Sequence, residues 1–114
     1  MPNQNLHVYV VDIDGELRVI PPITKADGSG NAGNRDKLVL HNNTTEDFVF
    51  CFGPRSVHAA NPTFVSVAPG GTSAPTEVIS KGNGNAELFT FQAVAYKSGK
   101  KAKGNSDPIL IIEN

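Results

Sequence analysis

The sequence contains one cysteine, one methionine and no tryptophan. A single cysteine cannot form a disulfide within the chain, so the fold is not a disulfide scaffold and suits a reducing compartment. No segment approaches the roughly 18 apolar residues of a transmembrane helix. The N-terminal stretch "MPNQNLHVYVVDIDGE" lacks a basic region, and Asp12 interrupts its apolar run, which argues against a signal peptide. We therefore predict a cytoplasmic protein, or a secreted one if the chain is a trimmed piece of an exported protein.

Charge of either sign is also scarce. Ten Lys and Arg residues oppose eleven Asp and Glu residues, a net charge of −1. This balance gives no general attraction to nucleic acid or anionic membranes. Four lysines gather in one loop, with Tyr96 as the only aromatic residue nearby: Lys97, Lys100, Lys101 and Lys103. We interpret that loop as a solvated hairpin tip, because base stacking requires more aromatic residues.

Short β-type segments fill the 114 residues, which we expect to form one domain over 1–114. Eleven glycines and eight prolines punctuate them. No segment shows a helical period, and turn signals recur about every ten residues, a pattern typical of an all-β sandwich or barrel. The eight segments expected to form strands are 5–13, 16–20, 37–42, 47–53, 63–71, 72–80, 86–96 and 108–114.

Three local patterns refine this prediction. Asp14-Gly15 is a hairpin turn signal, because both residue types tolerate positive φ. Alternation in "DFVFCFG" places Phe48, Phe50 and Phe52 on one face, expected to be a core face, and Cys51 on the other. By the same alternation, the segment 86–96 places Phe89, Phe91, Ala93 and Ala95 on one face. Pro75 cannot donate to a β-ladder, so the segment 72–80 is expected to be an edge strand.

Two motifs in the first third of the chain are discounted. "GSGNAG" (28–33) matches a dinucleotide-binding G-x-G-x-x-G letter for letter, but a strand pattern and not a helix follows it. We expect a long flexible loop over 24–35. "DIDGE" (12–16) resembles part of a calcium loop but lacks the later Glu and the flanking helices. A hairpin turn with solvated carboxylates is the simpler interpretation.

Three segments together resemble the cupredoxin family: "DKLVLHNNTTEDFVF", "VSVAPGGTSAPTEVI" and "ELFTFQAVAYKSGKKAKGNSDPILIIEN". The shared pattern is a strand ending in an Asn-rich turn, a Pro-Gly turn before an edge strand, and a final hairpin with a β-branched last strand. The resemblance covers about the last 80 residues and implies a Greek-key sandwich of about eight strands; immunoglobulin-like sandwiches share much of it. Copper-binding cupredoxins carry Cys, His and Met in the loop before the last strand. Here that loop, "AYKSGKKAKGNSDP", has none of them, which implies a member without the type-1 copper site.

The remaining soft metal ligands are Cys51, His41, His58 and His7. Our interpretation assigns none of them to a metal or catalytic site: Cys51 is a small apolar residue, His41 a strand-end residue and His58 a loop residue. The alternative is a copper-binding or redox protein that uses Cys51 with His41 or His58. A weaker alternative is a cysteine-dependent enzyme.

The predicted function is accordingly that of a small non-catalytic binding or structural module with no cofactor. We expect it to act through its loops or an exposed strand edge. Its partner would be an unidentified protein or a second copy of the chain, and not nucleic acid or a membrane.

Overall fold

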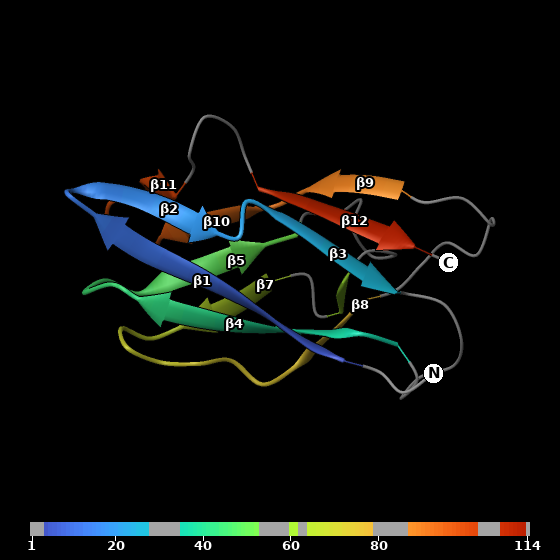
Figure 1. Cartoon of the computed structure of the whole chain (residues 1–114). Coiled ribbons are helices and arrows are strands. Elements are labelled where there is room, and N and C mark those ends of the chain that lie inside the picture. Colours follow the sequence, from blue (N-terminus) through green and yellow to red (C-terminus); the bar gives the residue numbers. More distant parts are fainter. Residues whose placement is uncertain are drawn as a thin grey trace.

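The computed structural model describes residues 4–27, 35–52, 60–61, 64–78, 87–102 and 108–113. Within these ranges the chain is all-β, with no helix (Figure 1). The strands are β1 (Asn5–Ile13), β2 (Glu16–Ile20), β3 (Ile23–Asp27), β4 (Lys37–Asn43), β5 (Phe48–Cys51), β6 (Ala60–Asn61), β7 (Phe64–Val67), β8 (Thr76–Val78), β9 (Glu87–Thr90), β10 (Gln92–Ala95), β11 (Lys101–Ala102) and β12 (Ile109–Glu113). The predicted fold class, all-β, is confirmed.

The first hairpin forms where its turn residues predict it. Asp14 and Gly15 have φ of 52° and 85°, the left-handed values that a two-residue hairpin turn requires. The backbone amide of Gly15 donates to the Asp12 carboxylate at 2.9 Å. Strands β1 and β2 then pair antiparallel from Ile13 opposite Glu16 to Tyr9 opposite Ile20.

Two sheets face each other across the main core. The first has the order β2-β1-β4-β8-β6 and the second β11-β10-β5-β7; Figure 1 shows β1, β2 and β4 in front of β5, β7 and β10. In the first sheet, β1 pairs parallel with β4. One cluster of buried residues fills the interior: Val8, Val10, Val19, Ala26, Leu38, Leu40, Phe48, Phe50, Phe52, Val67, Val78, Phe91, Ala93, Ala95, Ala102 and Leu110. The arrangement is sandwich-like, and the predicted core face of Phe48, Phe50 and Phe52 is confirmed.

A third sheet corrects two predictions. Its order is β3-β12-β9, with β3 parallel to β12. The long loop expected over 24–35 is therefore wrong for 24–27, which belong to β3. The long strand expected over 86–96 is divided. The Phe91 amide continues the β9–β12 pairing by donating to the Pro108 carbonyl (3.1 Å), and from Gln92 on β10 pairs with β5 of the second sheet. In both places long-range pairing overrides the local pattern.

The strand after Pro75 is not at an edge, contrary to the prediction. β8 lies between β4 and the short β6, and Pro75 precedes the first residue of β8, so its missing N–H leaves the ladder intact. The Pro-Gly turn before β8 is present, with Gly70 at φ 71°. A Cβ on Gly71 would lie 2.9 Å from the Ala68 carbonyl oxygen, so only glycine fits there without a shift. The turn predicted at 82–85 lies outside the described residues.

Two buried polar side chains hold the strand ends. Asn42 is fully buried; its amide donates to the carbonyls of Glu46 (2.7 Å) and Val67 (2.9 Å), and its oxygen accepts from the Thr44 amide (3.1 Å). Asp36 accepts from the amides of Gln4 (2.9 Å) and Asp27 (2.8 Å). Asn42 thus ties the β4–β5 turn to β7 of the opposite sheet. Such satisfied buried groups fix one arrangement of the strands.

Candidate functional site

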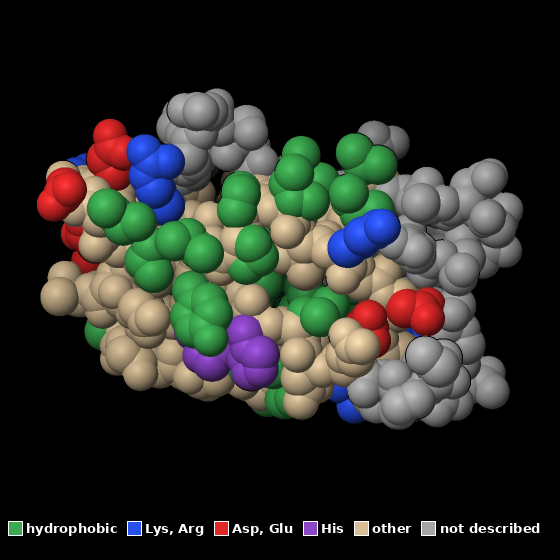
Figure 2. Space-filling model, in the orientation of Figure 1, with side chains coloured by type: hydrophobic (Ala, Val, Ile, Leu, Met, Phe, Trp, Pro, Cys, Tyr) green, Lys and Arg blue, Asp and Glu red, His purple; other side chains and the backbone are tan. Residues whose placement is uncertain are grey.

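Three aromatic rings meet on the outer face of β1 and β4. Residues His7 and Tyr9 lie two apart on β1 and share this face, while Val8 and Val10 point into the core. Tyr9 is paired in register with His41 of β4. The Tyr9 and His41 rings stack, with centroids 4.4 Å apart and planes 15° apart. Figure 2 shows both histidines (purple) side by side on this face, next to hydrophobic surface.

A hydrogen-bond chain runs through the histidines. His7 Nδ1 and His41 Nε2 are 2.8 Å apart, and His41 Nδ1 is 3.0 Å from the Thr72 hydroxyl. Thr72 is held beside His41 because the adjacent backbone pairs with β4, the Asn42 amide donating to the Gly71 carbonyl at 3.0 Å. If the Nδ1 atom of each histidine carries a proton, both links have one donor and one acceptor. His41 Nδ1–H then donates to Thr72, and His7 Nδ1–H donates to His41 Nε2. We call His7, Tyr9, His41 and Thr72 the imidazole cluster.

The surroundings of His41 favour its neutral form. Desolvation by the neighbouring rings, and secondly the charge of His7 when protonated, lower the pKa of His41 from its ordinary value. Two imidazolium ions at this separation would repel each other. At neutral pH the cluster therefore presents an uncharged His41.

Cys51 lies on the other side of the molecule. It alternates with the buried Phe48 and Phe50 and so points outward from the second sheet, whereas His41 points outward from the first. The core separates the two side chains. Burial raises the pKa of the Cys51 thiol, and the thiol donates to the Val49 carbonyl at 3.9 Å. Cys51 and His41 are thus not brought together; His58 lies outside the described residues, and a pairing of Cys51 with His58 stays a prediction.

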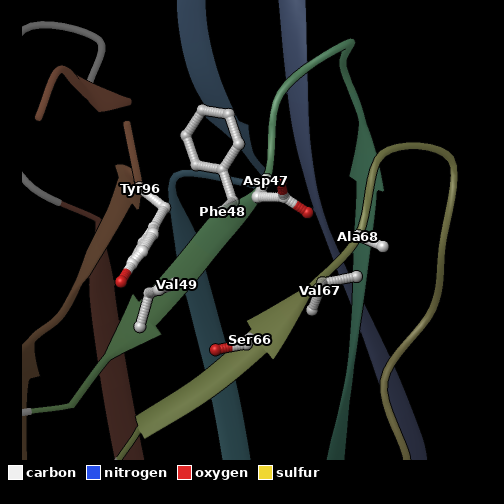
Figure 3. A pocket seen from close by; sticks show the side chains of 7 residues that line it. All are labelled: Asp47, Phe48, Val49, Ser66, Val67, Ala68 and Tyr96. Carbon is white, nitrogen blue, oxygen red and sulfur yellow. The ribbon is translucent and has the colours of Figure 1, made fainter. Parts of the chain in front are cut away.

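An open pocket of about 580 Å³ lies where three turns meet at one end of the second sheet. Asp47 comes from the β4–β5 turn, Ala68 from the β7–β8 turn, and Tyr96 from the turn after β10. In Figure 3, the hydroxyls of Tyr96 and Ser66 point to the same side of β5 as Val49, and the Phe48 ring points away. Tyr96 is 68% exposed. The remaining lining residue, Val67, belongs to the core.

Apolar side chains are also exposed on the strands next to the imidazole cluster. Figure 2 shows them as a band of green surface. The large ones on β1, β2, β3 and β9 are Ile13, Ile20, Ile23 and Leu88, each more than 40% exposed. β2 also carries an exposed ion pair between Arg18 and Glu16.

The structure describes some of the other motifs singled out in the sequence, and the rest lie outside the described residues. Asp12 of the "DIDGE" segment is engaged in the hairpin turn, and no group of three or more His, Cys, Asp or Glu side chains suited to a metal ion occurs among the residues that the structure describes. Lys97 and Lys100 are exposed beside a turn at Gly99 (φ 72°); Lys103 lies outside the described ranges. "GSGNAG" is likewise outside them.

The sequence did not single out His7, Tyr9 or Thr72 as members of one site. Only the i, i+2 spacing of His7 and Tyr9 on one strand gave a signal, because such residues share a face. Their approach to His41 depends on the parallel register of β1 and β4, which no local sequence pattern predicts.

Comparison with models of known protein families and with curated protein sequences finds no match to this chain. In the described part of the chain, no helix has the length and apolar character needed to cross a membrane.

Proposed function

We propose that this chain is a small non-catalytic binding module that recognises a protein partner through the pocket at Tyr96. Its scaffold would be a Greek-key, cupredoxin-like sandwich without the type-1 copper ligands. The observation that carries the proposal is the meeting of three turns around an open pocket with a largely exposed phenol. Loops positioned by a rigid sheet are where binding residues concentrate.

The turns around the pocket are held in place by backbone hydrogen bonds. The Tyr96 amide donates to the Asp47 carbonyl at 2.8 Å, and the Gly99 amide donates to the Ala95 carbonyl at 2.8 Å. Asn42 fixes the β4–β5 turn from below through the Glu46 carbonyl. Little ordering of these turns is needed on binding, which favours affinity.

The lining suits an amphipathic side chain of a partner. Val49 and Ala68 supply apolar contact, the Tyr96 ring a flat aromatic surface, and the Asp47 carboxylate an acceptor for a cationic or hydroxyl group. Tyrosine is enriched at the centres of protein interfaces because it joins a large apolar area to a polar end.

The test uses peptides selected for binding to the full chain from a displayed random library. We expect the selected peptides to shift the amide resonances of Asp47, Ser66 and Tyr96, and to lose most of their affinity for Tyr96→Ala. Phe64→Ala is the matched control, because Phe64 is an aromatic residue of the same sheet and is 60% exposed, but does not line the pocket. Peptides that bind Tyr96→Ala as well as the unchanged protein would refute the proposal.

Self-association is the competing use of the same surface. Sedimentation velocity of the unchanged protein and of Tyr96→Ala separates the two. A monomer in both samples is expected. A dimer that Tyr96→Ala dissociates would replace the peptide partner with a second copy of the chain.

A further inference from the structure

The imidazole cluster has the geometry of a chelate. His7 Nδ1 and His41 Nε2 lie 2.8 Å apart, joined by a hydrogen bond that an ion bound to both nitrogens would replace. Two nitrogens bound at about 2.0 Å to one ion lie roughly 2.8 Å apart at a bond angle of 90° and about 3.3 Å apart at the tetrahedral angle. The observed separation therefore matches two neighbouring positions of a square-planar or octahedral ion. Binding moves the His7 proton from Nδ1 to Nε2 and turns the exposed His7 ring, so that both lone pairs are directed at the ion.

Neighbouring groups hold His41 in the orientation of a ligand. With the His41 proton on Nδ1, the Thr72 hydroxyl accepts from this N–H (3.0 Å), which leaves the lone pair on Nε2. Metal-binding histidines usually donate their second ring N–H to such a partner, which fixes tautomer and ring plane. The stacked Tyr9 ring restricts the same plane from one side. The orienting group and the stacking ring are thus in place without any metal.

An imidazole must be neutral to bind an ion, so binding at this site competes with protonation. The groups that face His41 are His7 and Tyr9 from β1 and Thr72 from the segment before β8.

We propose that His7 and His41 form a two-imidazole binding site for a divalent ion of the Cu²⁺ and Ni²⁺ class, with Thr72 as a positioning residue. Imidazole ligands at neighbouring positions suit these ions, which favour tetragonal geometry. His7 is exposed on the surface, so the other positions would be filled by water or by a group of an approaching molecule. The site differs from the copper hypothesis of the sequence, which relied on Cys51. It also does not depend on the proposed function at Tyr96.

The experiment is a calorimetric titration of the full, reduced chain with Ni²⁺, which does not oxidise the thiol. We expect one ion per chain. His7→Gln and His41→Gln should each weaken binding by at least about tenfold, because a single imidazole remains. Thr72→Val should weaken it by about tenfold through loss of the orienting hydrogen bond, and Thr72→Ser, which keeps the hydroxyl, should restore it.

Two matched controls separate this site from other soft ligands. His58→Gln removes the third histidine, and Cys51→Ser removes the thiol; both should bind Ni²⁺ within about twofold of the unchanged chain. Cu²⁺ bound to the Cys51→Ser chain should show electron paramagnetic resonance coupling to two imidazole nitrogens. Circular dichroism checks that every variant is folded.

Three results would overturn the proposal. The first is Ni²⁺ binding by the unchanged chain no tighter than by the His7→Gln/His41→Gln double variant, which would leave a plain hydrogen bond between the rings. The second is loss of binding in Cys51→Ser or in His58→Gln, which would move the ion to those residues. The third is coupling to a single nitrogen.

Discussion

The reactive side chains on the two outer faces of the sandwich differ in their hydrogen-bond partners. On the β1–β4 face, His7, His41 and Thr72 form one continuous hydrogen-bond chain. On the β5–β7–β10 face, the described part of the chain places no other titratable group in a hydrogen bond with Cys51, whose thiol lies 3.9 Å from the Val49 carbonyl. The histidines of the first face are thus linked to each other, whereas the thiol of Cys51 is linked to no second titratable side chain among the described residues.

Sequence distance is a poor guide to which of these residues meet. His41 and Cys51 are close in the chain, yet the β4–β5 turn carries them into opposing sheets and alternation points them apart. His7 and His41 are 34 positions apart, and a parallel strand pair brings them into contact. The register of a sheet, once set, decides every neighbour on both of its faces.

The largest expected effect is the loss of stability when the side chain that links the two sheets is removed. Asn42→Ala removes the side chain that donates to Val67 of the opposite sheet and leaves the Glu46 and Val67 carbonyls without that partner. We expect the free energy of unfolding to fall by about 3 kcal/mol, from lost hydrogen bonds and a buried gap. Urea denaturation measures it. Asn43→Ala, at the exposed neighbour, is the control and should change stability by less than about 0.5 kcal/mol.

A loss of under about 1 kcal/mol in Asn42→Ala would contradict the role of Asn42 as the tie between sheets. It would mean that water replaces the amide at no cost, and that the two faces are held in relation by apolar packing alone.

A second prediction concerns the reactivity of the Cys51 thiol. Because burial raises the pKa of the thiol, little thiolate exists at neutral pH, and the thiolate is the reacting form. Reaction with an aromatic disulfide reagent should be slower in the folded chain than in the urea-unfolded chain, and should accelerate only at alkaline pH. A folded-state reaction faster than the unfolded one at pH 7 would revive the cysteine-dependent enzyme as a hypothesis.

The smallest expected effect is the loss of stability at acidic pH that comes from protonation of His41. Its pKa is lowered in the folded state, so the unfolded chain takes up the proton more readily. Stability should be lost as pH falls through the ordinary histidine pKa of about 6.5 towards the folded value. Because the ring is only half-buried, the drop in Tm between pH 7.5 and 5.5 should be on the order of 1 °C. Calorimetry should show a smaller drop in His41→Gln; an equal drop would assign the effect to other groups.

Local chemistry made part of the fold predictable. The Asp14-Gly15 turn follows from the residues' tolerance of positive φ, and the buried row of Phe48, Phe50 and Phe52 follows from alternation. The strand at Ile23–Asp27 does not, because its buried residues, Thr24 and Ala26, are small and only pairing with β12 makes it a strand. The candidate site shares this limit, since the meeting of His7 with His41 is a product of register.

The parallel pairs also have a consequence for how the chain folds. The β1–β2 hairpin closes a two-residue turn and can form early. In contrast, β1 can pair with β4 only after the segment between them has been made, and β3 pairs with β12 near the end of the sequence. Pairings that close such large loops form slowly, since chain entropy is lost before contacts compensate for it. During synthesis, β3 would therefore leave the ribosome long before its neighbour exists. We expect that nascent stretch to be where chaperones engage this protein.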